Sequence, residues 1–266
     1  MASHFIHFNR RDIRLRFPTD PQDPWFSELQ CDSGGFERPR YHVTRAVDGP
    51  AREVQPGDTI WMVGQLYAPW NACLPATLDA RIDIETVGPR DRGPGYRYAA
   101  AATSRWFPLT DSTAKLGALN CVSSSQQIAP LWKNRRHPLG RYLQRMRKLA
   151  SDDLLREWEV EIESRPLHFI SYRIRDGSRA AFDCAKRLLG EGARIFWDRW
   201  SLPRRLAERR EAVGDRPLDE TIETNIHQAD IVWGIESPLY GAPGSYAVRE
   251  RELAKLLNKY RPVRFY

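Results

Sequence analysis

The chain has 266 residues, of which 41% are hydrophobic, so it can fold into one or two domains with a substantial core. Its 41 Lys and Arg residues exceed its 34 Asp and Glu residues, and the formal net charge of +7 favours anionic partners without identifying one. The sequence has neither a run of about 18 apolar residues nor a secretory signal pattern, which predicts a cytoplasmic protein with no membrane partner.

Four cysteines lie far apart in the sequence: Cys31, Cys73, Cys121 and Cys184. Because no two of them have the spacing of a zinc site or a redox dithiol, we interpret them as free thiols and expect no metal. Reduced thiols agree with a cytoplasmic protein.

Residues 1–150 carry the pattern of a mainly β domain. Short runs of alternating polarity, separated by turn residues, predict five strands at His4–Phe8, Tyr41–Val47, Thr59–Val63, Thr77–Val87 and Tyr96–Ala102. In the fourth run the apolar residues recur at every second position, as in a half-buried strand. We therefore expect a small antiparallel barrel or sandwich.

Pro56-Gly57-Asp58 is typical of a tight turn that leads into a strand, although such turns occur in many β domains. Together with this turn, the stretches QPGDTIWMVGQLY and LPATLDARIDIETV resemble the PUA-like and EVE-like barrels, which hold a modified base or a nucleotide. The resemblance implies a sensing or docking domain with a nucleotide or nucleic acid as its trigger. Four aromatic residues fit either a stacking pocket for such a ligand or the domain core: Trp61, Tyr67, Trp70 and Trp106.

Residues 133–148 contain seven Lys and Arg residues and no acidic residue. Leu139, Leu143 and Met146 recur at helical spacing, so we predict an amphipathic helix with a basic outer face at the end of the N-terminal domain. That face fits either simple solvation or contact with phosphates or a partner.

A helical pattern over Asp152–Ile162 is followed by Pro166, and we interpret residues 151–166 as a linker. Beyond it, strand and helix patterns alternate in the way typical of a parallel α/β sheet. Strands are predicted at Leu167–Tyr172, Ala193–Asp198, Ile231–Ser237 and Arg261–Tyr266, with a long charged loop after the second. Helices are predicted from Asp176 or Ser178, from Pro217, and over Tyr246–Tyr260.

Four stretches in order, LHFISYR, GARIFWDRWSLP, ADIVWGIESPLY and GSYAVRERELA, resemble a TIR domain across residues 167–266. The resemblance implies a flavodoxin-like parallel sheet flanked by helices, here lacking the family's last strand and helix. Many members cleave or cyclise NAD as their substrate without a further cofactor, at sites completed between protomers. The resemblance therefore implies an assembly-activated homo-oligomer that consumes NAD, in a role such as antiphage defence.

Enzymatic members of that family place a catalytic Glu four residues beyond an aromatic residue, on the helix after the third strand. Tyr246 and Glu250 match this spacing, while Glu252 competes because Leu253 follows it directly, as is common in the family. At about 100° per residue, Glu250 falls on the apolar side of the helix and Glu252 on the charged side. We therefore predict Glu250 as the catalytic residue, because an inward carboxylate needs a partner, a cavity or a ligand.

Five further residues are predicted to line the NAD cleft: Ser171, Tyr172, Arg173, Trp200 and Tyr246. Arg173, at the carboxyl end of the first strand, fits contact with a pyrophosphate or a surface ion pair. Trp200 fits stacking on nicotinamide or adenine, or packing as a lid or protomer contact. Ser171 and Tyr172 are predicted to line the cleft only from their positions in the family resemblance. Asp198 is expected to brace the loop after the second strand.

Cleavage of the nicotinamide–ribose bond develops positive charge on the sugar, which a nearby carboxylate stabilises. The resemblance thus favours an NAD glycohydrolase or an ADP-ribose cyclase, which differ in whether water or an adenine nitrogen attacks. Two alternatives stay open: a non-enzymatic TIR adaptor for signalling assembly, and an enzyme similar to nucleoside deoxyribosyltransferases, which also use a Glu beside a ribose.

Overall fold

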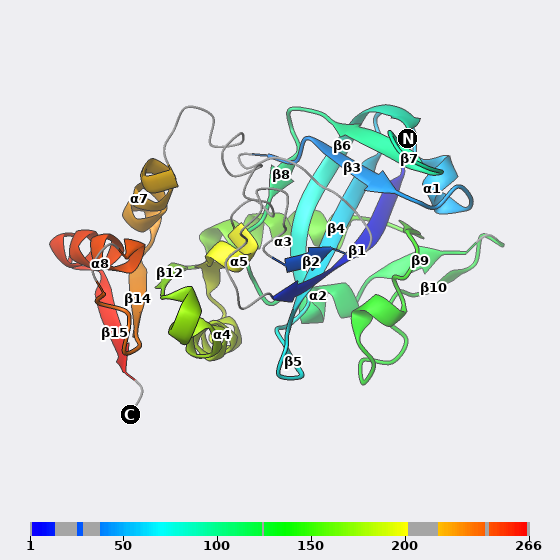
Figure 1. Cartoon of the computed structure of the whole chain (residues 1–266). Helices are drawn as coiled ribbons and strands as arrows, with labels where there is room; N and C mark the ends of the chain where they lie inside the picture. Colours follow the sequence, from blue (N-terminus) through cyan, green and yellow to red (C-terminus); the bar gives the residue numbers. More distant parts are fainter. Residues whose placement is uncertain are drawn as a thin grey trace.

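The computed structural model describes residues 2–13, 26–28, 38–123, 125–201, 218–242 and 245–264. They form a mixed α/β structure with a large sheet in the N-terminal half and a smaller parallel sheet in the C-terminal half (Figure 1). Among these residues no helix has the length and apolar character needed to cross a membrane. Cys31 and the charged loop predicted at residues 202–217 lie outside the described residues.

The N-terminal sheet follows the strand path β10-β9-β11-β1-β4-β6-β7-β3, with β2, β5 and β8 attached at its sides. Its strands are β1 (His4–Ile13), β2 (Phe26–Glu28), β3 (Tyr41–Thr44), β4 (Thr59–Ala68), β5 (Ala72–Cys73), β6 (Thr77–Pro89), β7 (Tyr96–Ala100), β8 (Arg105–Trp106), β9 (Asn120–Val122), β10 (Ile128–Pro130) and β11 (Arg147–Leu149). The five predicted strands are all present, as β1, β3, β4, β6 and β7.

The predicted barrel is not found among the described strands, because the path ends openly at β10 and β3. The neighbours β1 and β4 pair in parallel, from His4 opposite Thr59 to Asp12 opposite Tyr67. Parallel neighbours need a long crossover rather than a hairpin, and this topology departs from that of an up-and-down barrel. The described result is a large mixed sheet.

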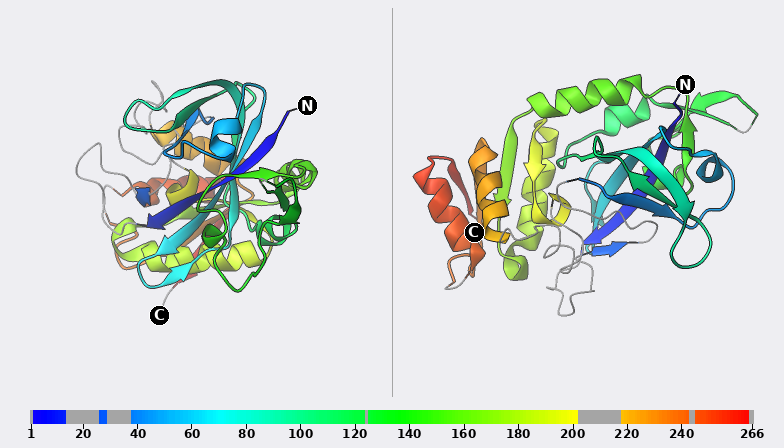
Figure 2. Two further views of the ribbon diagram at one scale, coloured as in Figure 1. Left: turned by 90° about the vertical axis from the view of Figure 1, so that its right-hand side faces the viewer. Right: turned by 90° about the horizontal axis from the view of Figure 1, so that it is seen from above.

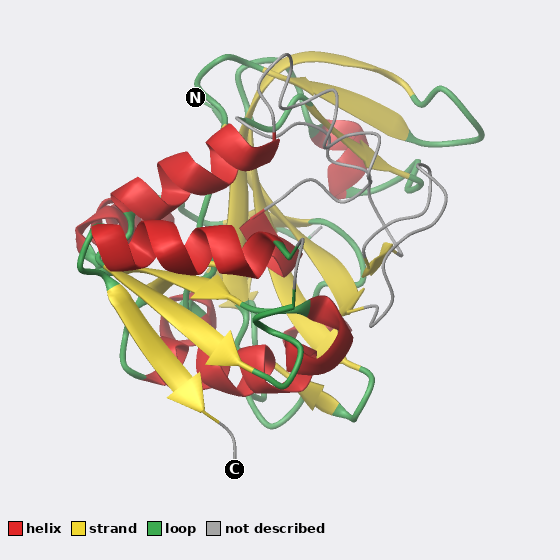
Figure 3. Cartoon of the chain, turned by 60° about the vertical axis from the view of Figure 1, so that its left-hand side comes forward, coloured by secondary structure: helices red, strands yellow, loops and turns green. Residues whose placement is uncertain are grey.

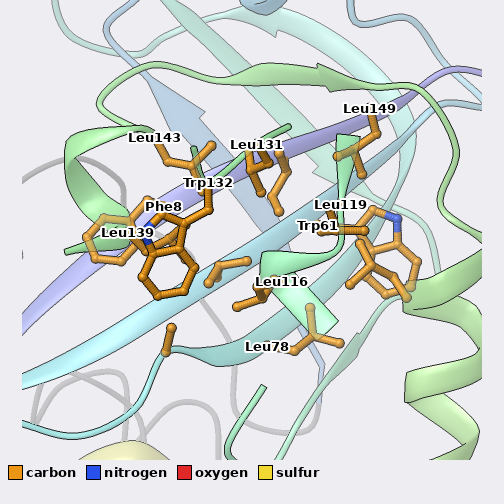
Figure 4. Packing of buried hydrophobic residues seen from close by; sticks show 14 of the residues in the cluster. Phe8, Trp61, Leu78, Leu116, Leu119, Leu131, Trp132, Leu139, Leu143 and Leu149 are labelled. Atoms are coloured by element: carbon orange, nitrogen blue, oxygen red, sulfur yellow. The ribbon is translucent and has the colours of Figure 1, made fainter. Parts of the chain in front are cut away.

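Two apolar clusters pack on this sheet, and consecutive strand residues alternate between them, as the two-residue period of a strand requires. Trp61 lies in one cluster with Phe8, as Figure 4 shows, while its neighbour Ile60 lies in the other with Phe5 and Tyr98. Two short helices border the sheet, α1 (Pro50–Glu53) and α2 (Thr113–Gly117). The alternating pattern therefore identifies the core-forming strands correctly.

The amphipathic helix predicted over residues 133–148 is wrong. These residues contain a short 3-10 turn, η1 (Leu139–Arg141), and lead into β11 through further turns. Pro138 and Gly140 interrupt the segment, since proline removes a backbone donor and glycine disfavours a helix interior. The apolar residues of the pattern are nevertheless buried: Leu139, Leu143 and Met146.

The segment predicted as a linker contains the helix α3 (Asp153–Ser164), which packs on the N-terminal sheet. Trp158 and Ile162 are buried in its apolar cluster, and Glu159 accepts a hydrogen bond from Arg81 Nη1 of β6 at 2.6 Å. Seen from above, α3 runs beside this sheet and leads into the C-terminal half (Figure 2). The segment is therefore part of the N-terminal core.

The C-terminal sheet has the order β13-β12-β14-β15, and each pair is parallel. Its strands are β12 (Leu167–Ser171), β13 (Arg194–Phe196), β14 (Ile231–Glu236) and β15 (Tyr260–Arg264). Its helices are α4 (Ile174–Gly190), α5 (Asp198–Ser201), α7 (Leu218–Gln228) and α8 (Tyr246–Leu256). The prediction of a parallel sheet with flanking helices is confirmed.

Helices cover both faces of this sheet, with α4 on one side and α7 and α8 on the other (Figure 3). Within β12, Ile170 packs in one cluster with Leu188 of α4, and its neighbour Phe169 packs in another with Ile226 of α7 and Ala254 of α8. Burial on both faces explains why β12 is a mainly apolar run in the sequence.

A buried ion pair ties the N-terminal sheet to the residues after β13. Arg11 Nη2 of β1 binds both carboxylate oxygens of Asp79 of β6 at 2.6 and 2.7 Å, and each side chain is 2% exposed. The Arg11 guanidinium also lies over the Trp200 ring at 4.1 Å and donates to the Trp200 carbonyl at 3.2 Å. Trp200 Nε1 donates in turn to the Phe107 carbonyl at 3.0 Å. Trp200 is therefore a structural residue of the junction.

The junction also covers one edge of the C-terminal sheet. Leu109 and Ile195 of β13 form an antiparallel bridge, in which each amide donates to the other's carbonyl at 3.2 and 2.8 Å. An uncovered edge would offer free backbone groups to another chain. The two sheets are thus joined by backbone pairing as well as by side chains.

We expect Asp79→Ala to lower the free energy of unfolding by about 3–5 kcal/mol, because it removes a carboxylate that compensates the buried charge of the Arg11 guanidinium. Denaturant unfolding followed by tryptophan fluorescence measures the change. The double variant Arg11→Met/Asp79→Ala removes both charges and should be more stable than Asp79→Ala alone. A double variant as unstable as the single one would contradict this role of the pair.

Candidate active site

Glu250 of α8 reaches the carboxyl end of the central strand β12. Its Oε2 accepts a hydrogen bond from Ser171 Oγ at 2.5 Å, and Ser171 is the last residue of that strand. The helix lies close to the sheet because Ala247 and Ala254 are buried small residues on its inner side. Open α/β sheets bind their ligands at the carboxyl ends of the strands, so this position is a candidate site.

Burial raises the pKa of the Glu250 carboxyl to about 7. The Ser171 hydrogen bond opposes this rise in pKa, since it favours the carboxylate, whereas the nearby negative charge of Asp198 adds to it. Near neutral pH the group is therefore balanced between its protonated and ionised forms. A cation bound beside it would favour the carboxylate.

Glu252 has the opposite environment on the outer side of α8. It is exposed and accepts hydrogen bonds from Arg251 Nε at 2.9 Å and from Lys255 Nζ at 3.5 Å. The Arg251 hydrogen bond lowers the pKa of the Glu252 carboxyl. The inward and outward directions expected from helix geometry are thus the directions that the two side chains take.

A shallow pocket lies between α7 and α8, beside Glu250. Its lining residues are Ile222, Glu223, Ile226, Tyr246, Arg249, Glu250 and Leu253. Tyr246, one turn before Glu250, is 50% exposed, so its ring is accessible at the pocket. The pocket thus combines apolar side chains with one carboxyl that is readily protonated.

Tyr172 belongs to a polar group next to Ser171. Its hydroxyl donates to Asp198 Oδ1 at 2.8 Å and accepts from Arg199 Nε at 3.0 Å. Burial raises the pKa of the Tyr172 hydroxyl. Asp198, the first residue of α5, is therefore held by Tyr172, while the loop that it is expected to brace lies outside the described residues. Sequence reasoning missed Arg199, whose signal was a charged residue directly after a buried strand.

Tyr240 is a second residue that sequence reasoning missed. Its hydroxyl lies 2.9 Å from Ser171 Oγ, and the side chain is 2% exposed. Burial raises the pKa of the Tyr240 hydroxyl to about 12, while hydrogen bonds with Ser171 and Tyr260 lower it. Tyr260 donates in turn to Glu236 Oε1 at 3.0 Å. Ser171 thus contacts both Glu250 and the turn after β14, a connection that no local pattern revealed.

Arg173 follows Ser171 and Tyr172 directly, and its Nη1 donates to the Leu239 carbonyl at 3.0 Å. It therefore contacts the same turn that carries Tyr240. The structure does not bring Trp200 to this site: its ring is 5% exposed and packs at the junction with the N-terminal sheet. Of the predicted residues, Ser171 thus contacts Glu250 directly, and Tyr246 lines the same pocket. Tyr172 and Arg173 instead bond to Asp198 and to the Leu239 carbonyl.

The N-terminal aromatic residues do not form one stacking pocket. Trp61 is fully buried and stacks on Phe107, while Trp70 packs edge-on against Phe182 of α4. Trp106 packs against a third apolar cluster. Their placement favours the core interpretation over the ligand interpretation. The described residues also contain no group of three or more His, Cys, Asp or Glu residues that could hold a metal ion.

We expect the Glu250 carboxyl to titrate near pH 7 in ¹³C NMR of the folded protein. Ser171→Ala removes a hydrogen bond to the carboxylate and should move the midpoint to higher pH. Asp198→Asn removes a neighbouring negative charge and should move it to lower pH. A midpoint near the ordinary value of 4.5, unchanged in both variants, would contradict the described environment.

The raised pKa also couples stability to pH. The folded state holds the Glu250 proton more tightly than the unfolded chain, so this contribution to stability is present below pH 4.5 and is lost as pH rises through about 7. Glu250→Gln lacks this titrating group. Its free energy of unfolding, measured relative to that of wild type, should therefore rise from acid to alkaline pH by up to about 3 kcal/mol, because one pKa unit corresponds to ~1.4 kcal/mol. Denaturant unfolding across this range measures the effect, and Glu252→Gln should show no such rise.

Comparisons of the chain with protein-family models, with curated proteins and with solved structures find no match. The functional inference therefore rests on the geometry around Glu250 and on the order of the sequence motifs.

Proposed function

We propose that the chain is a TIR-like enzyme that cleaves NAD, as an NAD glycohydrolase or an ADP-ribose cyclase. The observation that carries the proposal is the Glu250 carboxyl, held by Ser171 at the carboxyl end of β12 with a pKa of about 7. The order of the motifs over residues 167–266 supports it, and the parallel sheet with helices on both faces agrees with it. No other cofactor takes part in the proposed reaction.

The proposed reaction needs a carboxylate and no strong acid. The bond between the ribose carbon and the nicotinamide nitrogen breaks, and its electron pair goes to the pyridinium ring, which leaves as neutral nicotinamide. The Glu250 carboxylate stabilises the positive sugar until water or an adenine nitrogen bonds to the same carbon. When water attacks, its proton passes to the carboxylate or to solvent.

The charge of the substrate fits the poised carboxyl. Nicotinamide in NAD is a cation, and a cation beside Glu250 favours the carboxylate over the protonated form. The group that burial keeps half protonated in the empty site would therefore ionise as the substrate binds. The ionisation of Glu252 would not respond to a bound cation in this way, because Glu252 already forms ion pairs with Arg251 and Lys255.

The surrounding residues have distinct proposed roles. Ser171 positions the Glu250 carboxylate, and Tyr240 positions Ser171. Arg173, beside the same strand end, is proposed to meet the pyrophosphate, and Tyr246 to contact the nicotinamide ribose from the edge of the pocket. Tyr172 acts as a brace for Asp198 and Arg199.

Assembly is part of the proposal. The pocket beside Glu250 is shallow, and a second copy of the chain is proposed to complete it, so that a homo-oligomer is the active form. The N-terminal half is proposed to act as the sensing or docking unit that controls assembly, as in an antiphage effector.

Release of nicotinamide from NAD by the purified protein, measured in dilute and in crowded or concentrated samples, tests the proposal. Glu250→Gln should lower kcat by at least about 100-fold, since it removes the charge that stabilises the transition state, whereas Glu252→Gln should retain near wild-type turnover. In wild type kcat/KM should rise as pH increases towards about 7, because this ratio reports the free enzyme and the carboxylate is the active form.

Other outcomes identify the alternatives. Loss of turnover in Glu252→Gln but not in Glu250→Gln would overturn the assignment of the site. A wild-type protein that assembles but releases no nicotinamide under any condition would point to an adaptor. Exchange of a free base into a deoxynucleoside, without consumption of NAD, would point to a deoxyribosyltransferase-like enzyme.

A further inference from the structure

The net positive charge of the protein is concentrated in one short segment. Residues 133–148 carry seven Lys and Arg residues and no acidic residue, and without them the chain has 34 basic and 34 acidic residues. The seven are Lys133, Arg135, Arg136, Arg141, Arg145, Arg147 and Lys148. We call residues 133–148 the basic loop. The formal charge of +7 is thus a local property of this loop.

The basic loop is held in place by buried side chains. Leu139 and Leu143 are fully buried in the cluster around Phe8 and Trp132, as Figure 4 shows, and Met146 is buried in the neighbouring cluster. Trp132 Nε1 donates to the His137 carbonyl at 2.9 Å, which ties the start of the loop to the core. The loop therefore presents its cations from a fixed framework.

The cations of the basic loop face solvent and are poorly neutralised. Six of the seven are exposed, and Lys148 is half-buried. Arg145 lies 3.7 Å from Asp48 and Lys148 lies 3.8 Å from Glu53, in surface pairs that stabilise little. Among the described residues no carboxylate lies within ion-pair distance of the other five. The surface is thus complementary to a polyanion.

The surface lies far from the Glu250 site. The neighbouring strands β9 and β10 form one end of the molecule, and α8 and β15 form the opposite end (Figures 1 and 2). A ligand of the basic loop therefore differs from the substrate of the candidate active site.

We propose that the basic loop binds the phosphate backbone of a nucleic-acid duplex without reading its sequence. The clustered, exposed cations of the loop are complementary in charge to the phosphates of a duplex, and each contact with a phosphate releases counterions. The aromatic residues of the loop favour a duplex over a single strand, since His137 and Tyr142 are half-buried rather than presented as stacking platforms. The direction of the apolar residues argues against a membrane surface, because Leu139, Leu143 and Met146 point into the core instead of outward.

Fluorescence anisotropy with a labelled duplex of about 20 base pairs tests the proposal on the full-length protein. Wild type should bind with an affinity that falls steeply with salt. Arg136→Gln/Arg141→Gln should weaken binding by about tenfold and should reduce the slope of log affinity against log salt by about two, or one for each lost phosphate contact.

The matched control is Arg92→Gln/Lys186→Gln, which removes the same charge from two exposed positions outside the loop. It should bind the duplex like wild type. Equal weakening by both double variants would overturn the proposal, because binding would then follow net charge alone. Absence of duplex binding by wild type would also overturn the proposal. So would a protein that binds phosphatidylserine vesicles through Arg136 and Arg141 but does not bind the duplex.

Discussion

The buried guanidinium of Arg11 is the interaction on which the arrangement of the two sheets depends. It sits between Asp79 of β6 and Trp200 of α5, and it contacts both through charge, hydrogen bonding and ring stacking. A buried charge is costly unless it is paired, so the loss of one of these three residues destabilises the positions of the other two. The residues that follow β13 are therefore placed by the N-terminal sheet as much as by the C-terminal one.

The contacts of Arg11 are one of several connections between the N-terminal sheet and the C-terminal sheet. The backbone bridge between Leu109 and Ile195 and the packing of Trp70 on Phe182 make the same connection through other elements. The helix α3, which leads into β12, is itself packed in the N-terminal core. A change at Arg11 of β1 or Asp79 of β6 therefore bears directly on α5, the helix that carries Trp200 and begins at Asp198.

At the carboxyl end of β12, by contrast, the burial of an ionisable side chain is unfavourable. The Glu250 carboxyl is partly withdrawn from water with one strong donor, Ser171, and its raised pKa records the unfavourable energy of ionising it there. An uncharged residue at this position would avoid that energy. Ionisable groups in such positions are common at functional sites, where a ligand supplies the missing stabilisation. The hydroxyls of Tyr240 and Tyr260 extend the arrangement towards Glu236.

Local patterns in the sequence determined much of this protein. The two-residue period predicted five strands of the first sheet, alternation of strands and helices predicted the second sheet, and the 100° step of a helix separated Glu250 from Glu252. Each of these depends on geometry within a few neighbouring residues, which the sequence carries directly.

Tertiary structure alone decided the remainder. The sequence suggested an antiparallel barrel or sandwich, a basic helix and a Trp200 that lines the cleft, whereas the fold produced an open mixed sheet, an anchored loop and a buried junction residue. It also brought Tyr240 to Ser171 and Asp79 to Arg11. These outcomes depend on contacts between residues far apart in the chain, where the energy lies in the pairing of distant strands and in the burial of particular side chains. Such pairing leaves no periodic trace in a sequence.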